Sequence, residues 1–219
     1  AAALGDWTGG PPTSYFPAKD GQSSPRLEIS ERVTEQVHLC LGVPGLSNRH
    51  PDRFVLDLLN VILGEGMSSR LFLEIREKQG LAYDVHSQIT HYMDTGAAMV
   101  YAGVDPRRAE DTIRAVLELL YAFKDQPVSA EEVTKAKEFT KGRLFLRMED
   151  TRSVVGWMGS QELLLGQILT VDEVVEIIES ITPEELQRVA QSLFVPERLS
   201  LAMVGPIKDA QAFSQILKL

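Results

Sequence analysis

Two side chains that could bind a ligand together lie in one stretch of the sequence, GEGMSSRLFLEIREKQGLAYDV at residues 64–85. Arg76 precedes a glycine at position 80, and Tyr83 follows it. The stretch reads as a glycine turn, a helix, a glycine that ends the helix, and a strand. A guanidinium and a phenol at that joint are both hydrogen-bond donors, and together they could bind a peptide carbonyl or a developing oxyanion.

Ordinary helix-end and strand chemistry offers a second interpretation of the same residues. Arg76 and Lys78 would be cations in the last turn of a helix, where the helix dipole favours them by about 0.3–1 kcal/mol. Tyr83 would be a strand aromatic that shares a face with Val85 and Ile89. Taken without other knowledge, the residues favour this second interpretation.

The rest of the sequence contains no complete catalytic motif. Neither His-x-x-x-His nor His-x-x-Glu-His occurs, so the usual helical zinc ligands are missing and we expect no metal site built by this chain alone. His86 and His91 lie on one expected strand and should face opposite sides of it. There is no Gly-x-Ser-x-Gly elbow. Cys40 falls in the middle of another expected strand, where it reads as a small buried residue.

The composition excludes several classes of partner. The chain has 219 residues, of which 44% are hydrophobic and 24% charged, as is ordinary for a globular protein. Its net charge of -9 argues against nucleic acid as a partner. No apolar run approaches the roughly 18 residues of a membrane span, so we expect no membrane partner. The single cysteine excludes an internal disulfide and is typical of a reducing compartment, which predicts a cytoplasmic location.

The first residues have the composition of a linker. The stretch GGPPTSYFPAKDGQSSP is rich in Gly, Pro and Ser, and the residues before it have neither a Met nor the basic segment of a signal peptide. We predict that residues 1–26 are an interdomain linker together with the remnant of a preceding domain. Residues 27–219 are then one folded unit.

Hydrophobic periodicity and capping signals predict a mixture of strands and helices in that unit. Strands are expected within residues 34–45, 81–93, 96–104 and 198–206, the second and third as a hairpin. Helices are expected at 51–64, 68–78, 106–125, 129–149, 151–166, after residues 170 and 182, and at 208–219. Three of these helices begin at predicted capping boxes, and acidic residues in their first turns also complement the helix dipole: Ser129 with Glu132, Thr170 with Glu173, and Thr182 with Glu185. Long crossovers separate the strands, which suggests an α+β fold with one mixed, mainly antiparallel sheet and helices packed on one face.

The same stretch at residues 64–85 resembles the C-terminal half of the pitrilysin/insulinase family of zinc metallopeptidases. The nearest branch is that of bacterial enzymes similar to mitochondrial processing peptidase. SSRLF and REKQGLAY are the specific parts of the resemblance, and KGRLFLRMED and RLSLAMVGP follow in the family's order. The resemblance therefore covers nearly the whole chain.

The resemblance implies a protein built from two related halves. Each half is an α+β domain, and the two face each other as a clamshell around a chamber. The N-terminal half binds zinc through an inverted His-x-x-Glu-His motif and a distal glutamate, and the C-terminal half has lost these ligands. Residues 27–219 would then be the non-catalytic half-domain, with no cofactor of its own and with zinc in the companion N-terminal half.

The resemblance also implies roles for particular residues. Family members place an arginine and a tyrosine, spaced as Arg76 and Tyr83 are, near substrate main chain beside the zinc. These two are the candidate catalytic residues, as donors to a carbonyl or oxyanion. The candidate substrate-binding residues lie in the preceding turn, where the glycines would let the backbone approach the substrate: Gly64, Gly66, Ser68 and Ser69.

The function that follows is the C-terminal substrate-binding half of a zinc-dependent endopeptidase. Its partners would be peptide substrates and the N-terminal zinc-binding half, and an isolated half could form a homo-oligomer through its docking face. One alternative is a separate, catalytically inactive structural or partner subunit of the same fold, like the core subunits of a respiratory complex. The presence of both Arg76 and Tyr83 argues against it. Another alternative is an unrelated α+β ligand-binding domain.

Overall fold

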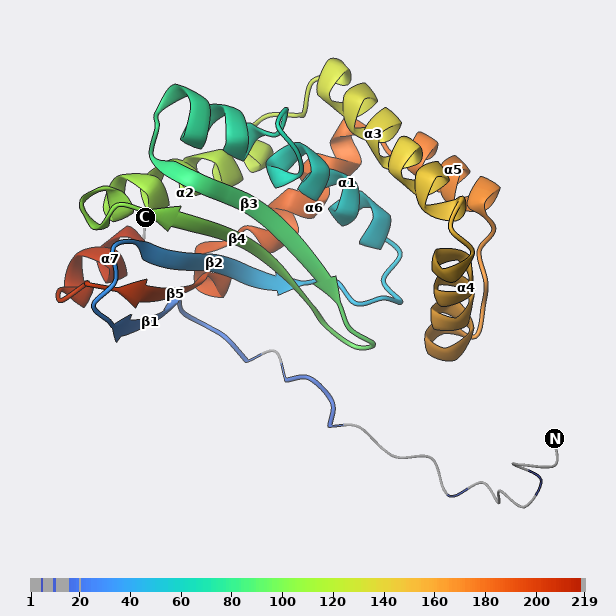
Figure 1. The fold of residues 1–219 in the computed structure, drawn as a ribbon, viewed down its shortest axis with the longest axis horizontal. Helices are drawn as coiled ribbons and strands as arrows, with labels where there is room; N and C mark the ends of the chain where they lie inside the picture. Colours follow the sequence, from blue (N-terminus) through green and yellow to red (C-terminus); the bar gives the residue numbers. More distant parts are fainter. Residues whose placement is uncertain (1–4, 6–9, 11–15, 20, 218–219) are drawn as a thin grey trace.

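One five-stranded sheet forms the centre of the computed structural model, and helices pack against one of its faces (Figure 1). The structure describes residues 5, 10, 16–19 and 21–217. The prediction of an α+β fold with one mixed, mainly antiparallel sheet is confirmed. The predicted linker at residues 1–26 falls largely outside the described residues and stays a prediction.

The strand order in the sheet is β1-β5-β2-β4-β3. The strands are β1 (Arg26–Glu31), β2 (Val37–Gly45), β3 (Ala82–His91), β4 (Gly96–Val104) and β5 (Ser200–Gly205). β1 runs parallel to β5, and the other neighbouring pairs are antiparallel. β3 and β4 form the expected hairpin.

β1 was not predicted from the hydrophobic pattern. Its sequence, RLEISE, contains only two apolar side chains, Leu27 and Ile29. Both are partly buried and pack against the core, and the strand pairs with β5 along its whole length. Two apolar positions are too few for an alternating pattern to be recognised in the sequence. The segment becomes a strand because it pairs with β5.

The helices lie between the strands along the chain, except for α7, which follows β5. The α-helices are α1 (Arg53–Gly64), α2 (Ala109–Asp125), α3 (Ala130–Met148), α4 (Thr151–Leu165), α5 (Val171–Ser180), α6 (Pro183–Leu193) and α7 (Ala210–Ile216). A π-helix, η1, spans Leu71–Lys78, and the 3₁₀ turns η2 and η3 span Pro106–Arg108 and Pro196–Arg198. The three predicted capping boxes are present at the starts of α3, α5 and α6, where each satisfies backbone groups that the helix leaves unpaired.

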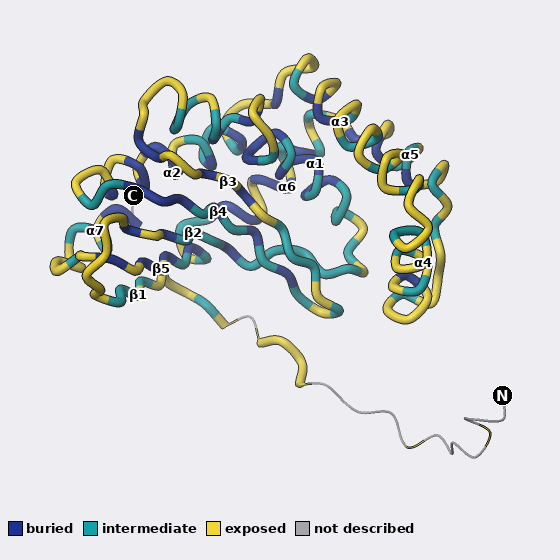
Figure 2. Tube along the Cα trace, in the orientation of Figure 1, coloured by how far each residue is buried: buried dark blue, intermediate teal, exposed yellow. Residues whose placement is uncertain are grey.

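Along the strands, buried residues alternate with more exposed ones (Figure 2), so the two faces of the sheet differ in burial. In β2, Leu39 and Leu41 are each 1% exposed, whereas His38, on the opposite face of the strand, is exposed to solvent. The same alternation runs through β4 and β5. The buried face packs against α1, α2, α6 and η1, and α3 and α5 lie outside α1. None of the described helices has the length and hydropathy that crossing a membrane requires.

His91, at the end of β3, connects three segments of the fold. Its Nδ1 lies 2.6 Å from the carbonyl oxygen of Leu46, and its Nε2 lies 3.0 Å from Oδ1 of Asp57 on α1. Both partners are hydrogen-bond acceptors, so the ring satisfies both when it is protonated and donates from each nitrogen. The hydrogen bond to Asp57 is the largest cause that raises the pKa of His91. His91 faces the helices and His86 faces solvent, as their spacing predicted.

We expect this pair to make stability depend on pH. Because the folded-state pKa of His91 is raised above its ordinary value of 6.5, the stabilisation is complete below that value and is lost as pH rises through the folded-state pKa. His91→Gln should lower the free energy of unfolding by about 1–2 kcal/mol in mild acid and by less in mild base. Urea unfolding at both pH values measures this.

A double-mutant cycle with Asp57→Asn isolates the pair from other effects of each substitution. The coupling energy between His91 and Asp57 should shrink in mild base. A coupling energy that is the same at both pH values would show that His91 does not act as a cation here.

Candidate functional site

Arg76 and Tyr83 lie against each other in the structure. The Cζ atom of Arg76 is 4.9 Å from the centroid of the Tyr83 ring and 4.9 Å from that of the Phe72 ring. The nearest carboxylate is on Glu77, with 3.8 Å between the Nε of Arg76 and Oε1 of Glu77. Within the described chain the Arg76 guanidinium makes no hydrogen bond, so its N–H groups remain available to a ligand.

The helix that carries Arg76 is wider than an α-helix. The sequence favoured an ordinary helix from Ser68, whereas the structure has a π-helix that begins at Leu71. The N–H of Gln79 donates to the carbonyl of Glu74 at 3.2 Å, a bond across five residues. Gly80 then takes a φ of 58°, the left-handed conformation expected for the residue that ends this helix. Such π segments are frequent at functional sites.

Tyr83 sits in a β-bulge, which sets the direction of its side chain. Ala82 pairs with Val104 and Asp84 pairs with Gly103, so Tyr83 is an extra residue without a partner on β4. Its side chain is 77% exposed, whereas Val85 is 7% exposed. The interpretation of Tyr83 as a strand residue on the face of Val85 is therefore wrong, because the bulge shifts the alternation.

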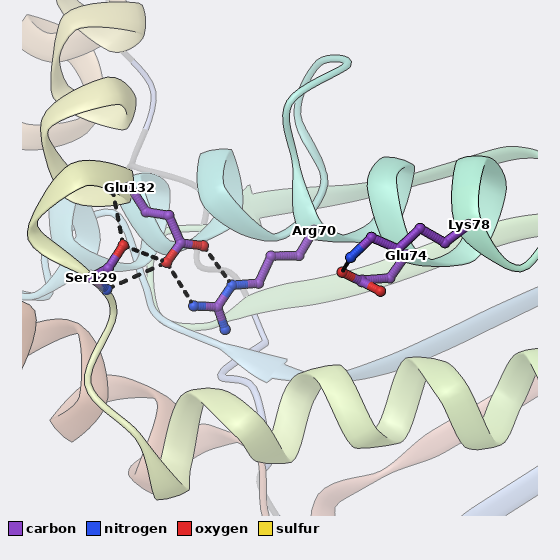
Figure 3. A network of polar contacts seen from close by, with 5 residues as sticks. All are labelled: Arg70, Glu74, Lys78, Ser129 and Glu132. Carbon is purple, nitrogen blue, oxygen red and sulfur yellow. Dashed lines mark hydrogen bonds and ion pairs between the residues drawn. The ribbon is translucent and has the colours of Figure 1, made fainter.

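Arg70 anchors the start of η1 to the start of α3 (Figure 3). Its Nε and Nη2 donate to the two carboxylate oxygens of Glu132 at 2.8 and 3.0 Å, and its Cζ lies 4.2 Å from the centroid of the Phe123 ring. The same carboxylate accepts hydrogen bonds from Ser129 in the capping box. The hydrogen bond from Arg70 is the main reason why the pKa of Glu132 is lowered. The sequence explained Glu132 by effects at the helix start, the capping box and the helix dipole, and missed this contact with Arg70.

The four candidate substrate-binding residues occupy different environments. Gly66 and Ser68 are exposed, and Gly66 has a φ of 82°. Gly64 is buried, and a Cβ there would lie 2.3 Å from the Oγ of Ser87 on β3. Ser69 is 2% exposed, and its Oγ donates to the carbonyl of Gly66 at 2.8 Å. Packing thus accounts for Gly64 and turn formation for Ser69, while Gly66 and Ser68 face solvent and their role in binding stays a prediction.

The open face of the sheet carries a second group of polar side chains. Tyr101 lies between two histidines, with its hydroxyl 2.7 Å from the Nδ1 of His38 and its ring centroid 5.1 Å from that of His86. Burial raises the pKa of the Cys40 thiol on the same face. Among the residues that the structure describes, no cluster of three or more His, Cys, Asp or Glu side chains could hold a metal ion.

Comparison with known proteins identifies the family. Residues 1–139 match the family described as the Peptidase M16 inactive domain. The chain belongs to the peptidase M16 family. This confirms the resemblance to the pitrilysin/insulinase zinc metallopeptidases and shows that the interpretation as an unrelated α+β domain is wrong.

Relatives in two bacteria are named as uncharacterized zinc proteases. The one from Streptomyces coelicolor is 38% identical over 187 residues, which cover 85% of this chain and 40% of the relative. The one from Bacillus subtilis is 37% identical over 176 residues, which cover 80% of this chain and 43% of the relative. The chain thus spans less than half the length of these relatives. This is consistent with the chain being one half of a two-domain M16 protein.

A solved structure supports the fold. The crystal structure of a peptidase M16 inactive domain from Pseudomonas fluorescens superimposes with a TM-score of 0.83. The match covers 91% of this chain and 48% of that chain at 22% sequence identity. At this identity the likeness concerns the fold, and the M16 inactive domain has the same α+β architecture.

The Arg70–Glu132 contact gives a test of how the helix of Arg76 is held. Glu132→Gln should lower the free energy of unfolding by about 1–2 kcal/mol, because a charged, half-buried bidentate pair loses its charge. Glu131→Gln is the matched control, since Glu131 lies in the same first turn and, among the described residues, forms an ion pair with exposed Lys135 alone. It should change stability by less than about 0.5 kcal/mol. Equal losses in urea unfolding would mean that Arg70 contributes nothing beyond the general charge of the helix start.

Proposed function

We propose that this domain is the C-terminal, substrate-binding half of a zinc-dependent endopeptidase. The observation that carries the proposal is the convergence of Arg76 and Tyr83 on one exposed corner of the sheet. The family match to an inactive domain and the zinc protease names of the relatives support it. In this proposal peptides are cleaved in a chamber between this half and an N-terminal half that carries the zinc.

The two side chains suit a carbonyl that gains negative charge. Zinc bound in the companion half would supply a water of lowered pKa as the attacking nucleophile. From this chain, the Tyr83 hydroxyl donates a hydrogen bond to the carbonyl oxygen of the substrate, and the bond strengthens as that oxygen becomes an oxyanion. Arg76 is fixed between two rings, so its guanidinium can donate to substrate main chain without reorganising.

The surface of this half has exposed apolar side chains that a partner half could cover. Seven large apolar side chains on α3 and α4 are 41% or more exposed: Phe139, Phe145, Leu146, Val155, Met158, Leu163 and Leu164. In α4 only Gln161 is buried, so this helix has almost no core contact of its own. Exposed apolar side chains gathered on two adjoining helices are typical of an interface. We propose that the companion N-terminal half is the partner, and that peptides are the substrates.

Tyr83→Phe in the complete two-half protein tests the donor role. The change removes one hydroxyl and keeps the ring that stacks on Arg76. If the hydroxyl stabilises an oxyanion, kcat should fall by about 10²–10³, with a modest change in KM and in stability. Steady-state cleavage of a quenched fluorescent peptide measures both constants.

Tyr92→Phe is the matched control, because Tyr92 is also exposed and lies at the far end of the hairpin. It should leave kcat unchanged. Arg76→Lys should also slow turnover, since an ammonium group cannot reproduce the planar fork. If Tyr83→Phe keeps kcat within about twofold while it lowers the melting temperature, Tyr83 is a packing residue and the proposed role fails.

Metal analysis tests whether zinc is bound by this half or by its companion. The described residues offer no cluster of ligands, so the purified chain should hold well under one zinc after dialysis against buffer without chelator. The complete protein should hold about one zinc. Stoichiometric zinc that this chain retains through dialysis would place the metal site here and contradict the division of roles.

A further inference from the structure

A cleft lies between α1 and the outer helices α3, α4 and α5. Its volume is about 690 Å³, and pockets that bind small molecules usually measure about 300–1,000 Å³. The most buried residues of its lining are Leu58 of α1 and Ile178 of α5, which are 1% and 3% exposed. Leu144 of α3 and Trp157 of α4 also line it. The cleft is therefore large enough for a small ligand, and it offers that ligand apolar contacts.

Polar contacts near the end of α4 hold this helix beside the cleft. Arg49 donates from its Nη2 to the carbonyl of Leu164 at 3.3 Å. The N–H of Leu169 donates to Oε1 of Gln161 at 3.1 Å. Gln161 is the one buried residue of α4, and Figure 1 shows this helix to one side of the helices that cover the sheet. The helix is thus fixed in place without being packed into the core.

α4 presents two different faces. Trp157, Gln161 and Leu164 recur at spacings of four and three, so they share one face of the helix, and all three line the cleft. The exposed side chains of Val155 and Met158 do not line it. A companion half that covers the outer face of α4 would therefore leave the face toward the cleft for another ligand.

The acidic side chains in the cleft already have partners. Oδ1 of Asp57 lies 3.0 Å from the Nε2 of His91. The carboxylate of Glu65 accepts hydrogen bonds from Arg143 and from the side chain of Asn60. Both acidic groups in the lining are thus engaged within the fold.

Two arginines of the same lining lack a carboxylate partner among the described residues. Nη1 of Arg53 donates to the carbonyl of Asn48, and its Cζ lies 4.5 Å from the centroid of the Phe54 ring, but Arg53 forms no ion pair there. Burial is the largest cause that lowers the pKa of Arg53. Arg147, which is exposed on the α3 side of the cleft, forms no ion pair in that part of the chain either. Buried charges are usually paired, so an anion would complete the environment of Arg53.

We propose that the cleft binds a free fatty acid, with its carboxylate on Arg53 and its alkyl chain between α1 and α4. A guanidinium binds a carboxylate through two parallel hydrogen bonds, so one partly buried arginine matches one carboxylate. The apolar lining beside Leu58 and Trp157 matches the chain. This site goes beyond the proposed function, because it uses neither Arg76 nor Tyr83.

The test titrates the whole chain carrying Trp7→Phe with dodecanoate below its critical micelle concentration. The sequence has two tryptophans, so in this variant all tryptophan fluorescence comes from Trp157, which lines the cleft. Binding should give a saturable blue shift, because the alkyl chain displaces water from the ring. Dodecyltrimethylammonium has the same chain with a cationic head, and it should bind at least about tenfold more weakly. The absence of a saturable shift, or equal affinity for the two amphiphiles, would overturn the proposal.

Arg53→Gln tests the contact with the carboxylate. It should weaken binding of dodecanoate at least about tenfold, because hydrogen bonds to a charged group are lost. Arg114→Gln is the matched control, since Arg114 is exposed on α2 and pairs with Glu110 at 2.9 Å. It should leave the affinity within about twofold. An unchanged affinity in Arg53→Gln would contradict the proposed contact.

Ser160 provides a second pair of variants, which leaves Arg53 and its contacts in the fold intact. Ser160 is exposed on α4 and lines the cleft. Ser160→Glu adds a negative charge there, and Ser160→Gln adds a side chain of the same size without charge. The Glu variant should bind dodecanoate at least about threefold more weakly than the Gln variant, because like charges repel. Equal binding by the two variants would show that the carboxylate does not lie in the cleft. No cleavage is measured, so these results are independent of the roles proposed for Arg76 and Tyr83.

Discussion

The contact between the end of α1 and the middle of β3 determines where the candidate site lies. A Cβ on Gly64 would stand 2.3 Å from the Oγ of Ser87 and 2.4 Å from its backbone nitrogen, so only glycine allows this approach. The Ser87 hydroxyl also donates to the carbonyl of Asn60 at 3.3 Å. With α1 ending against β3, the chain must turn back at once, and Gly66 does so with a positive φ. η1 then returns the chain to the start of β3, which brings Arg76 beside Tyr83.

Two arginines in this segment illustrate the difference between holding a structure and holding a ligand. Arg70 uses its guanidinium in a bidentate pair with Glu132 and stacks on a buried ring, so its charge is satisfied within the fold. The Arg76 guanidinium stacks on two rings but makes no hydrogen bond within the described chain. A cation over an aromatic ring at an exposed site contributes only about 0.5–1 kcal/mol. The fold fixes the position of Arg76 and leaves its donors free.

The sequence predicted the elements whose signals are local and missed those that depend on tertiary contacts. The capping boxes of α3, α5 and α6 need only residues three apart, and all are present. The apolar spacing of Leu71 and Ile75 predicted a helix and correctly placed both in the core, but this spacing does not distinguish a π-helix from an α-helix. β1 depends on its partner strand. The bulge did leave a signal, since Ala82 and Val85 are buried three positions apart where strict alternation requires an even spacing.

Stability does not explain the hydroxyl of Tyr83. The other sheet tyrosine, Tyr101, is hydrogen-bonded to His38, whereas within the described chain the Tyr83 hydroxyl has no hydrogen-bond partner. Its ring is 77% exposed, so it adds little apolar burial to the core. A bulge that disrupts the β3–β4 ladder and turns an aromatic side chain to solvent costs pairing and gains no packing in return. An exposed phenol beside a guanidinium whose donors are free within the described residues is the arrangement that the proposed contact of both groups with a substrate requires.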